Sequence, residues 1–149
     1  MIVVDASLAV KWFVPESDSL VALRFLARNR GELVSPDLLF VEVAGVLVRS
    51  ANQRAASKDA ASRTLDKLMS AETQRHIRAE RMTPELVARA ARIAIELGHP
   101  LKDCVYLALA IELDCLLATC DVHFRNKAAT SHPRVRLLAD LVEGSPPPG

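Results

Sequence analysis

Four acidic residues lie in parts of the sequence where a folded chain seldom leaves a charge. Asp5 follows the apolar run Ile2–Val4, and Asp121 follows a second apolar run, CLLAT. Glu42 lies inside LLFVEVAGVLV, and Asp103 is the third residue of the apolar segment LKDCVYLALAIEL. Because Asp and Glu are almost never buried without a partner, these acids are the strongest candidates for chemistry.

Carboxylates that converge on one place repel each other, and each then resists ionising. A hard divalent cation such as Mg²⁺ or Mn²⁺ relieves that repulsion, because such ions prefer carboxylate and water oxygens. A metal held in this way can polarise a phosphate and activate a water for in-line attack. Taken singly, Asp5 and Asp121 also fit helix N-caps, and Asp103 fits a first-turn acid. Together, the four favour a metal site.

Short apolar strands alternate with helices, which predicts an α/β sandwich around a parallel sheet. Asp5 and Asp121 each fall between a strand and a helix, and ligands bind at the carboxyl ends of strands in such sheets. The predicted strands are residues 2–4, 33–34, 74–77, 115–119 and 135–138. The predicted helices are residues 7–13, 19–30, 36–48, 57–70, 83–97, 101–113 and 122–127. We expect Ser35 to cap the helix at Pro36, which is apolar almost all round and so largely buried.

The 149 residues, half of them hydrophobic, suit one compact domain. We assign the domain to residues 1–141 and expect residues 142–149, which end in GSPPPG, to be disordered.

The 19 Lys and Arg nearly balance the 18 Asp and Glu, which argues against a broadly basic coat but leaves room for a local basic rim. Three cysteines without a CxxC pair predict reduced thiols. With no signal peptide and no apolar run near ~18 residues, a cytoplasmic protein outside the membrane is expected.

Several enzyme classes lack their motifs. Neither GxGxxG nor GxxxxGK[ST] occurs, so the phosphate loops of dinucleotide and P-loop sites are missing. A dehalogenase-like phosphatase would carry a second Asp two residues after Asp5, where this chain has Ser7. The four histidines show no HExxH spacing, which disfavours zinc chemistry.

Four segments together resemble the PIN-domain ribonucleases, and among them the VapC-type toxins of bacterial toxin–antitoxin pairs. They are VVDASLAVKWF, PDLLFVEVAGVL, HPLKDCVYLALAIEL and LLATCDVHF, each containing one of the four acids. Their order and spacing match, and the resemblance extends to about Leu141. It implies a three-layer α/β/α sandwich with a central parallel sheet.

The resemblance also implies a function. The protein would be an endoribonuclease that depends on Mg²⁺ or Mn²⁺, with Asp5, Glu42, Asp103 and Asp121 holding the metal and water as the nucleophile. Ser7 and Thr119 match polar positions beside the site in this family, although a cap and a strand residue are their simpler interpretations. A homodimer, a cognate antitoxin and an RNA substrate, such as a tRNA or another structured RNA, are implied as well.

Basic residues near the acids are candidate RNA contacts, although each also fits a solvated charge. They are Lys11, Lys102, Arg125 and Lys127. The sequence departs from the family on both sides of Asp103. Many relatives carry Tyr or Ala there, whereas this chain has Lys102 and Cys104. This departure leaves the acids intact and is expected to change contacts with RNA.

Two alternatives stay open. The chain also fits a PIN module that binds RNA or an antitoxin without cleaving, and the acids alone do not separate RNA from DNA cleavage. For the antitoxin we predict an apolar groove made by the helix at residues 19–30 and the helices within residues 37–70, because that region has more apolar surface than a small sheet covers.

Overall fold

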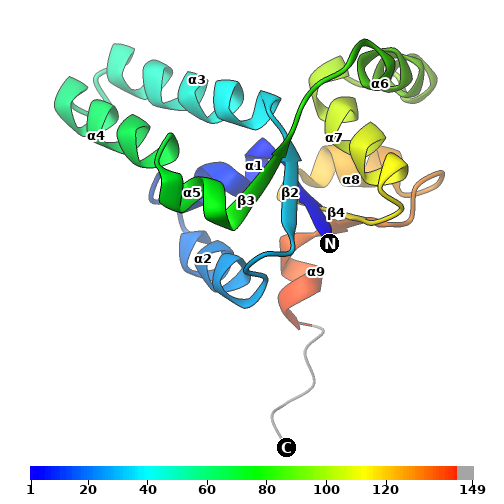
Figure 1. The fold of residues 1–149 in the computed structure, drawn as a ribbon, viewed down its shortest axis with the longest axis horizontal. Helices are drawn as coiled ribbons and strands as arrows, with labels where there is room; N and C mark the ends of the chain where they lie inside the picture. The colour runs from blue at the N-terminus through cyan, green and yellow to red at the C-terminus, as the bar shows by residue number, and fades with distance from the viewer. Residues whose placement is uncertain (144–149) are drawn as a thin grey trace, which may run out of the picture.

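Five parallel strands form a single sheet at the centre of the protein, in the order β3-β2-β1-β4-β5. The computed structural model describes residues 1–143, and Figure 1 shows the sheet surrounded by helices. The strands are β1 (Ile2–Val4), β2 (Leu33–Pro36), β3 (Ile77–Glu80), β4 (Leu116–Thr119) and β5 (Val135–Leu137). Parallel pairing of β1 with both β2 and β4 buries β1 in the middle of the sheet, as its apolar sequence requires.

Helices connect the strands and cover the sheet. In chain order they are α1 (Ala6–Ala9), the 3₁₀ turn η1 (Val10–Trp12), α2 (Ser19–Arg28), α3 (Leu38–Asn52), α4 (Lys58–Leu68), α5 (Ala71–His76), α6 (Pro84–Leu97), α7 (Leu101–Glu112), α8 (Val122–Ala128) and α9 (Leu138–Glu143). Helix α7 packs against β1, β2 and β4, with α6 packed on α7, while α1 contacts β4 and α3. The α3–α4 pair and the α6–α7 pair lie on opposite sides of the view in Figure 1. The predicted three-layer α/β/α sandwich is confirmed.

The order of the strands places the site. The chain runs from β1 outward to β2 and β3, then returns to the other side of β1 to form β4 and β5. The direction of winding therefore reverses between β1 and β4, and in open α/β sheets a crevice forms at that reversal, beyond the carboxyl ends of the strands. Asp5 follows β1 directly, and Asp121 lies two residues beyond Thr119, the last residue of β4.

The start of helix α3 differs from the sequence prediction. Ser35 and Pro36 are not a cap and a first helical residue but the end of strand β2, where they pair with Ala79 and Glu80 of β3. The Ser35 hydroxyl donates a hydrogen bond to the carbonyl of Val4 at 2.9 Å, across to β1. Pairing between strands thus outweighs the local helix-start signal, because the sheet satisfies these polar groups.

Helix α3 is also less buried than predicted. Its face with Leu39, Val43 and Leu47 is buried, whereas Val41 and Val48 are exposed. The helix packs by one side against α1, α4 and β2. An apolar sequence all round the helix therefore does not bury it, because neighbours cover only one side.

Two more local predictions are wrong. Residues 74–76 belong to helix α5 instead of a strand, because the Ser70 hydroxyl caps that helix at the backbone N–H of Thr73. Val142 and Glu143, assigned to a disordered tail, are the last residues of α9, and Val142 packs against the core with Leu141. The rest of that predicted tail, residues 144–149, lies outside the described residues.

Within residues 1–143, no helix is both long enough and apolar enough to span a membrane.

Candidate functional site

Asp5 is buried at the carboxyl end of β1, with 5% of its surface exposed. Its Oδ1 accepts hydrogen bonds from the backbone N–H of Leu8 (3.0 Å) and from the Ser7 hydroxyl (2.7 Å). Its Oδ2 accepts one from the hydroxyl of Thr119 (2.5 Å). Asp5 therefore caps helix α1, as its position in the sequence also allowed, and it does so with Oδ1. Its Oδ2 points toward Thr119 on β4.

The environment of Asp5 makes ionisation difficult. Burial raises the pKa of Asp5 from 3.8 to about 6, and the charge of Asp103 adds to the rise. The hydrogen bonds from Thr119, Ser7 and Leu8 act in the opposite direction. A carboxyl group with a raised pKa in a cavity is typical of a functional site, because a cation placed beside it would restore the charged form.

Ser7 and Thr119 connect Asp5 to the start of helix α8. The Ser7 hydroxyl oxygen also accepts from the backbone N–H of Cys120 (2.9 Å), and the Thr119 oxygen accepts from that of Asp121 (3.0 Å). Asp121 in turn caps α8, accepting from the N–H of Phe124 at 2.8 Å. The two hydroxyls predicted to lie beside the acids therefore do so, and they hold Asp5 and Asp121 in fixed relation.

Glu42 reaches the site from helix α3, with 14% of its side chain exposed. Its Oε2 accepts a hydrogen bond from the hydroxyl of Tyr106 at 2.7 Å, and its Oε1 lies 3.1 Å from Nζ of Lys102. Both partners come from helix α7. Burial, and then the bond to Glu42, raises the pKa of Tyr106 far above its ordinary value, so Tyr106 stays a neutral donor. The polar partners of Glu42 therefore come from α7, because its own helix α3 supplies none beside it.

Asp103 lies in the first turn of α7, where His99 holds it. Nε2 of His99 is 2.9 Å from Oδ2 of Asp103, while Nζ of Lys102 is 3.8 Å from Oδ1. The imidazole is buried and stacks on Phe124 with ring centroids 4.8 Å apart. Among the described residues, Nδ1 of His99 has no hydrogen-bond partner. The ring is therefore oriented by the stack and by Asp103.

All four acids line one cavity of about 470 Å³. Its remaining walls come from α1, η1, α3 and α7 and include Ser7, Val10, Val41, Arg49 and Lys102. Sequence reasoning missed three residues of the site: Arg49, which lines the cavity, and His99 and Tyr106, which contact Asp103 and Glu42. For His99 the available signal was its place four residues before Asp103, just ahead of the predicted helix.

The other candidate RNA contacts do not line this cavity. Lys11 pairs with Glu16 (2.6 Å) and Asp18 (2.7 Å), and only 12% of its side chain is exposed. Arg125 pairs with Asp140, and Lys127 donates to the carbonyl of Gly98. Of the four basic residues singled out in the sequence, only Lys102 lies among the acids.

The donor set suits a hard divalent ion, because carboxylate oxygens from four residues face one cavity. Each of the four carboxylates accepts hydrogen bonds or ion pairs from protein groups. Among the side chains that the structure describes, no three of Asp, Glu, His or Cys are gathered closely enough to enclose an ion. The four residues therefore fit Mg²⁺ or Mn²⁺, because their carboxylates suit such an ion and all line the same cavity. To bind one ion together, their side chains would have to move closer to each other. Lys102, which is exposed and pairs with Glu42, could move away most easily.

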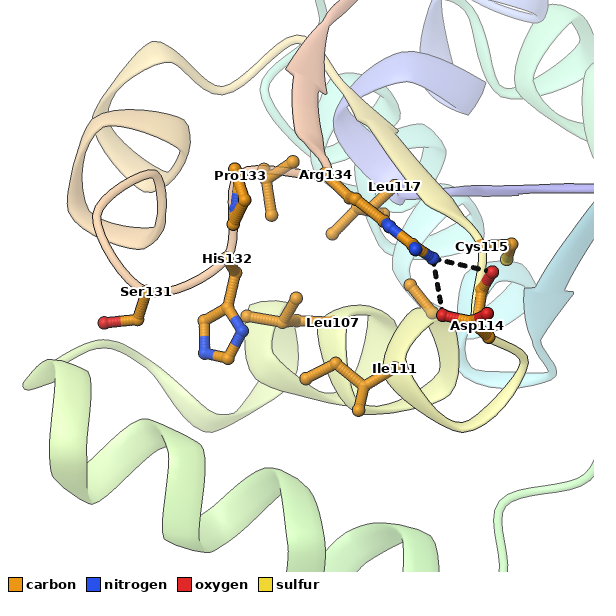
Figure 2. A pocket seen from close by; sticks show the side chains of 11 residues that line it. Leu107, Ile111, Asp114, Cys115, Leu117, Ser131, His132, Pro133 and Arg134 are labelled. Carbon is orange, nitrogen blue, oxygen red and sulfur yellow. Dashed lines mark hydrogen bonds and ion pairs between the residues drawn. The ribbon is translucent and has the colours of Figure 1, made fainter.

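A second hollow, of about 220 Å³, lies near the amino ends of β4 and β5, between the end of α7 and the segment before β5 (Figure 2). Its lining is mainly apolar, with Leu107, Ile111 and Leu117 on its walls. Figure 2 shows Arg134 turned toward Asp114 and bound to it, so its charge is already compensated. Among the residues that line it, Asp114 is the one carboxylate, so this hollow does not gather acids as the first cavity does.

The family model for the PIN domain matches residues 2–129. The chain belongs to the PIN domain family. This match confirms the family resemblance seen in the sequence, and PIN domains are in general nucleases.

Two solved structures resemble this one. The chain matches the Mycobacterium tuberculosis toxin VapC20, a sarcin-ricin loop cleaving toxin, with a TM-score of 0.67 and 18% identity, over 91% of this chain and 99% of that one. It matches PAE2754 from Pyrobaculum aerophilum with a TM-score of 0.69 and 22% identity, over 95% and 93% of the two chains. At such identities the likeness establishes the fold. The comparison with curated proteins found no match by sequence.

Proposed function

We propose that this PIN domain is an endoribonuclease that depends on Mg²⁺ or Mn²⁺ and serves as the toxin of a toxin–antitoxin pair. The observation that supports this most is the meeting of Asp5, Glu42, Asp103 and Asp121 on one cavity at the reversal point of the sheet. The same fold in VapC20, described as a toxin that cleaves the sarcin-ricin loop, supports the choice of RNA.

In this proposal the four carboxylates hold the ion directly or through water. A bound divalent ion would polarise a phosphate and lower the pKa of a water. Asp5 supplies Oδ2, held in place by Thr119, while its Oδ1 anchors α1. Tyr106 and His99 orient Glu42 and Asp103. With water as the nucleophile, the expected product carries a 5′-phosphate.

A second candidate is a PIN module that binds RNA or an antitoxin without cleaving. One observation favours it: among the described residues, no three of the acids lie close enough together to enclose an ion, and Lys102 already pairs with Glu42. The two candidates differ in whether the cavity takes up metal.

The proposed partners follow from the same family. We propose a homodimer that acts in the cytoplasm and is held inactive by an antitoxin. The antitoxin would lie on the apolar surface of α2, α3 and α4, where Leu20, Val48 and Leu65 are exposed. A complex in which the antitoxin lies elsewhere would contradict that placement.

The deciding experiment is cleavage of a panel of tRNAs and other structured RNAs by purified, antitoxin-free protein in Mg²⁺, Mn²⁺ or EDTA. We expect cleavage that requires metal and is lost in Asp103→Asn. The matched control is Asp114→Asn, which should cleave normally. Asp114 is an exposed acid that pairs with Arg134 near the amino end of β4, away from the cavity. Absence of both metal uptake and cleavage in folded wild-type protein would favour the binding module.

A further inference from the structure

Lys102 lies where a cation is expected. From the first turn of α7 its ammonium group reaches Glu42 on α3, with Nζ 3.1 Å from Oε1, and lies 3.8 Å from Oδ1 of Asp103. A lysine side chain is cationic at neutral pH. A full positive charge therefore lies between two of the four acids.

The position of Lys102 is not rigidly held. Its side chain is 62% exposed, and its flexible stem can carry the ammonium out of the cavity. Lys11, by contrast, is only 12% exposed between its two acids. Lys102 is thus a cation that can leave its carboxylates without disturbing the core.

Arg49 provides an internal comparison. It lines the same cavity from α3 and so contributes the same charge to the same space. Within the described residues, however, no carboxylate forms an ion pair with Arg49, whereas Lys102 pairs with Glu42 and Asp103. The two residues therefore separate the effect of net charge from the effect of occupying the carboxylates.

We propose that Lys102 is a built-in counterion that neutralises Glu42 and Asp103 while the site is metal-free and must leave them when a divalent ion binds. This inference rests on the proposed metal-dependent function and adds a means of regulating it. An ammonium and a divalent ion repel each other strongly at such distances, so an ion that binds these two carboxylates displaces Lys102. Once displaced, Lys102 stands at the cavity edge with Arg49, where both can contact an RNA phosphate. Metal loading and RNA capture are then coupled.

The test is titration of MnCl₂ into wild type, Lys102→Met and Arg49→Met by calorimetry at low salt. Methionine keeps an apolar stem and removes the charge. We expect Lys102→Met to bind Mn²⁺ at least about threefold tighter than wild type, and Arg49→Met to change affinity less, because a removed repulsion matters most at contact distance. Unchanged or weaker binding by Lys102→Met, or equal tightening by Arg49→Met, would overturn the inference.

Salt supplies a second readout. Because Lys102 is largely exposed, its pairs are screened by ions, so the advantage of Lys102→Met should shrink as NaCl rises from about 50 mM to about 500 mM. An advantage independent of salt would contradict a counterion role. If wild type and both variants are folded by circular dichroism yet none binds Mn²⁺, the proposed function fails together with this inference. If wild type binds and Lys102→Met binds equally, only this inference fails.

Discussion

Thr119 and Asp5, which are 114 residues apart in the chain, are joined by a hydrogen bond at the carboxyl ends of adjacent strands. The Thr119 hydroxyl donates to Oδ2 of Asp5 and accepts from the backbone N–H of Asp121. This one side chain therefore links two of the four acids across the reversal point of the sheet, and it helps Asp5 carry a charge in a buried place.

We predict that Thr119→Val raises the pKa of Asp5 further above 6 and destabilises the fold. The change keeps the shape of the side chain but removes the donor to Asp5 and the acceptor for Asp121. Leaving such buried groups unpaired costs about 1–3 kcal/mol. Urea unfolding at several pH values measures both effects. Thr119→Ser keeps the hydroxyl and should stay closer to wild type, so equal behaviour of the two variants would contradict the prediction.

Asp5→Asn should stabilise the metal-free protein at pH 8. The pKa of Asp5 is raised from 3.8 to about 6, so between these values the folded state keeps a proton that the unfolded state releases. The free energy of unfolding therefore falls as pH rises through this window, and above it the folded state bears the full penalty. At about 1.4 kcal/mol per pKa unit, the penalty is on the order of 3 kcal/mol.

Urea unfolding of wild type and Asp5→Asn at pH 4, 6 and 8 tests this sign. We expect the variant to gain about 1–3 kcal/mol over wild type at pH 8 and much less at pH 4. Under the proposed function it should also lose Mn²⁺ binding. An Asp5→Asn protein that is less stable than wild type at pH 8 would show that the hydrogen bonds to Asp5 outweigh the cost of its burial.

Tyr106→Phe should weaken the site while leaving the core nearly intact. Tyr106 is fully buried, and its ring stays packed when only the hydroxyl is removed. Glu42 then loses the donor at 2.7 Å. In a double-mutant cycle with Glu42→Gln, we expect a coupling energy of about 1–3 kcal/mol, as for hydrogen bonds to charged groups. A coupling near zero would mean that Lys102 alone holds Glu42.

His99→Phe should lower metal affinity with little loss of stability. Phenylalanine preserves the stack on Phe124, and His99 Nδ1 has no described partner to lose. Asp103 would no longer be oriented by Nε2, and loss of such an orienting partner typically weakens metal binding by about 10- to 100-fold. Calorimetry with MnCl₂ measures the effect. The control is His132→Phe, because His132 lines the second hollow, away from the acids; an equal effect of both changes would contradict a specific role for His99.

The sequence by itself determined the fold class and was enough to single out the four acids as candidates. Each acid is marked by local context, since Asp5 and Asp121 follow apolar strands and Glu42 interrupts an apolar helix. The order of strand, acid and helix is a short-range pattern, so it could be detected without knowing the fold. The helix from Pro84 to Leu97 was likewise predictable, because Thr83 caps it and Gly98 ends it in the left-handed region.

Only the tertiary structure decided what each acid contacts. Tyr106 meets Glu42 and Thr119 meets Asp5 across 64 and 114 residues, and no local pattern encodes such distances. Ser35 and Pro36 fit a helix start locally but became strand, because β3 offered hydrogen bonds to that segment. The same applies to the basic residues. Lys11, Arg125 and Lys127 pair with residues outside the cavity, whereas the long side chain of Lys102 on α7 reaches Glu42 on α3.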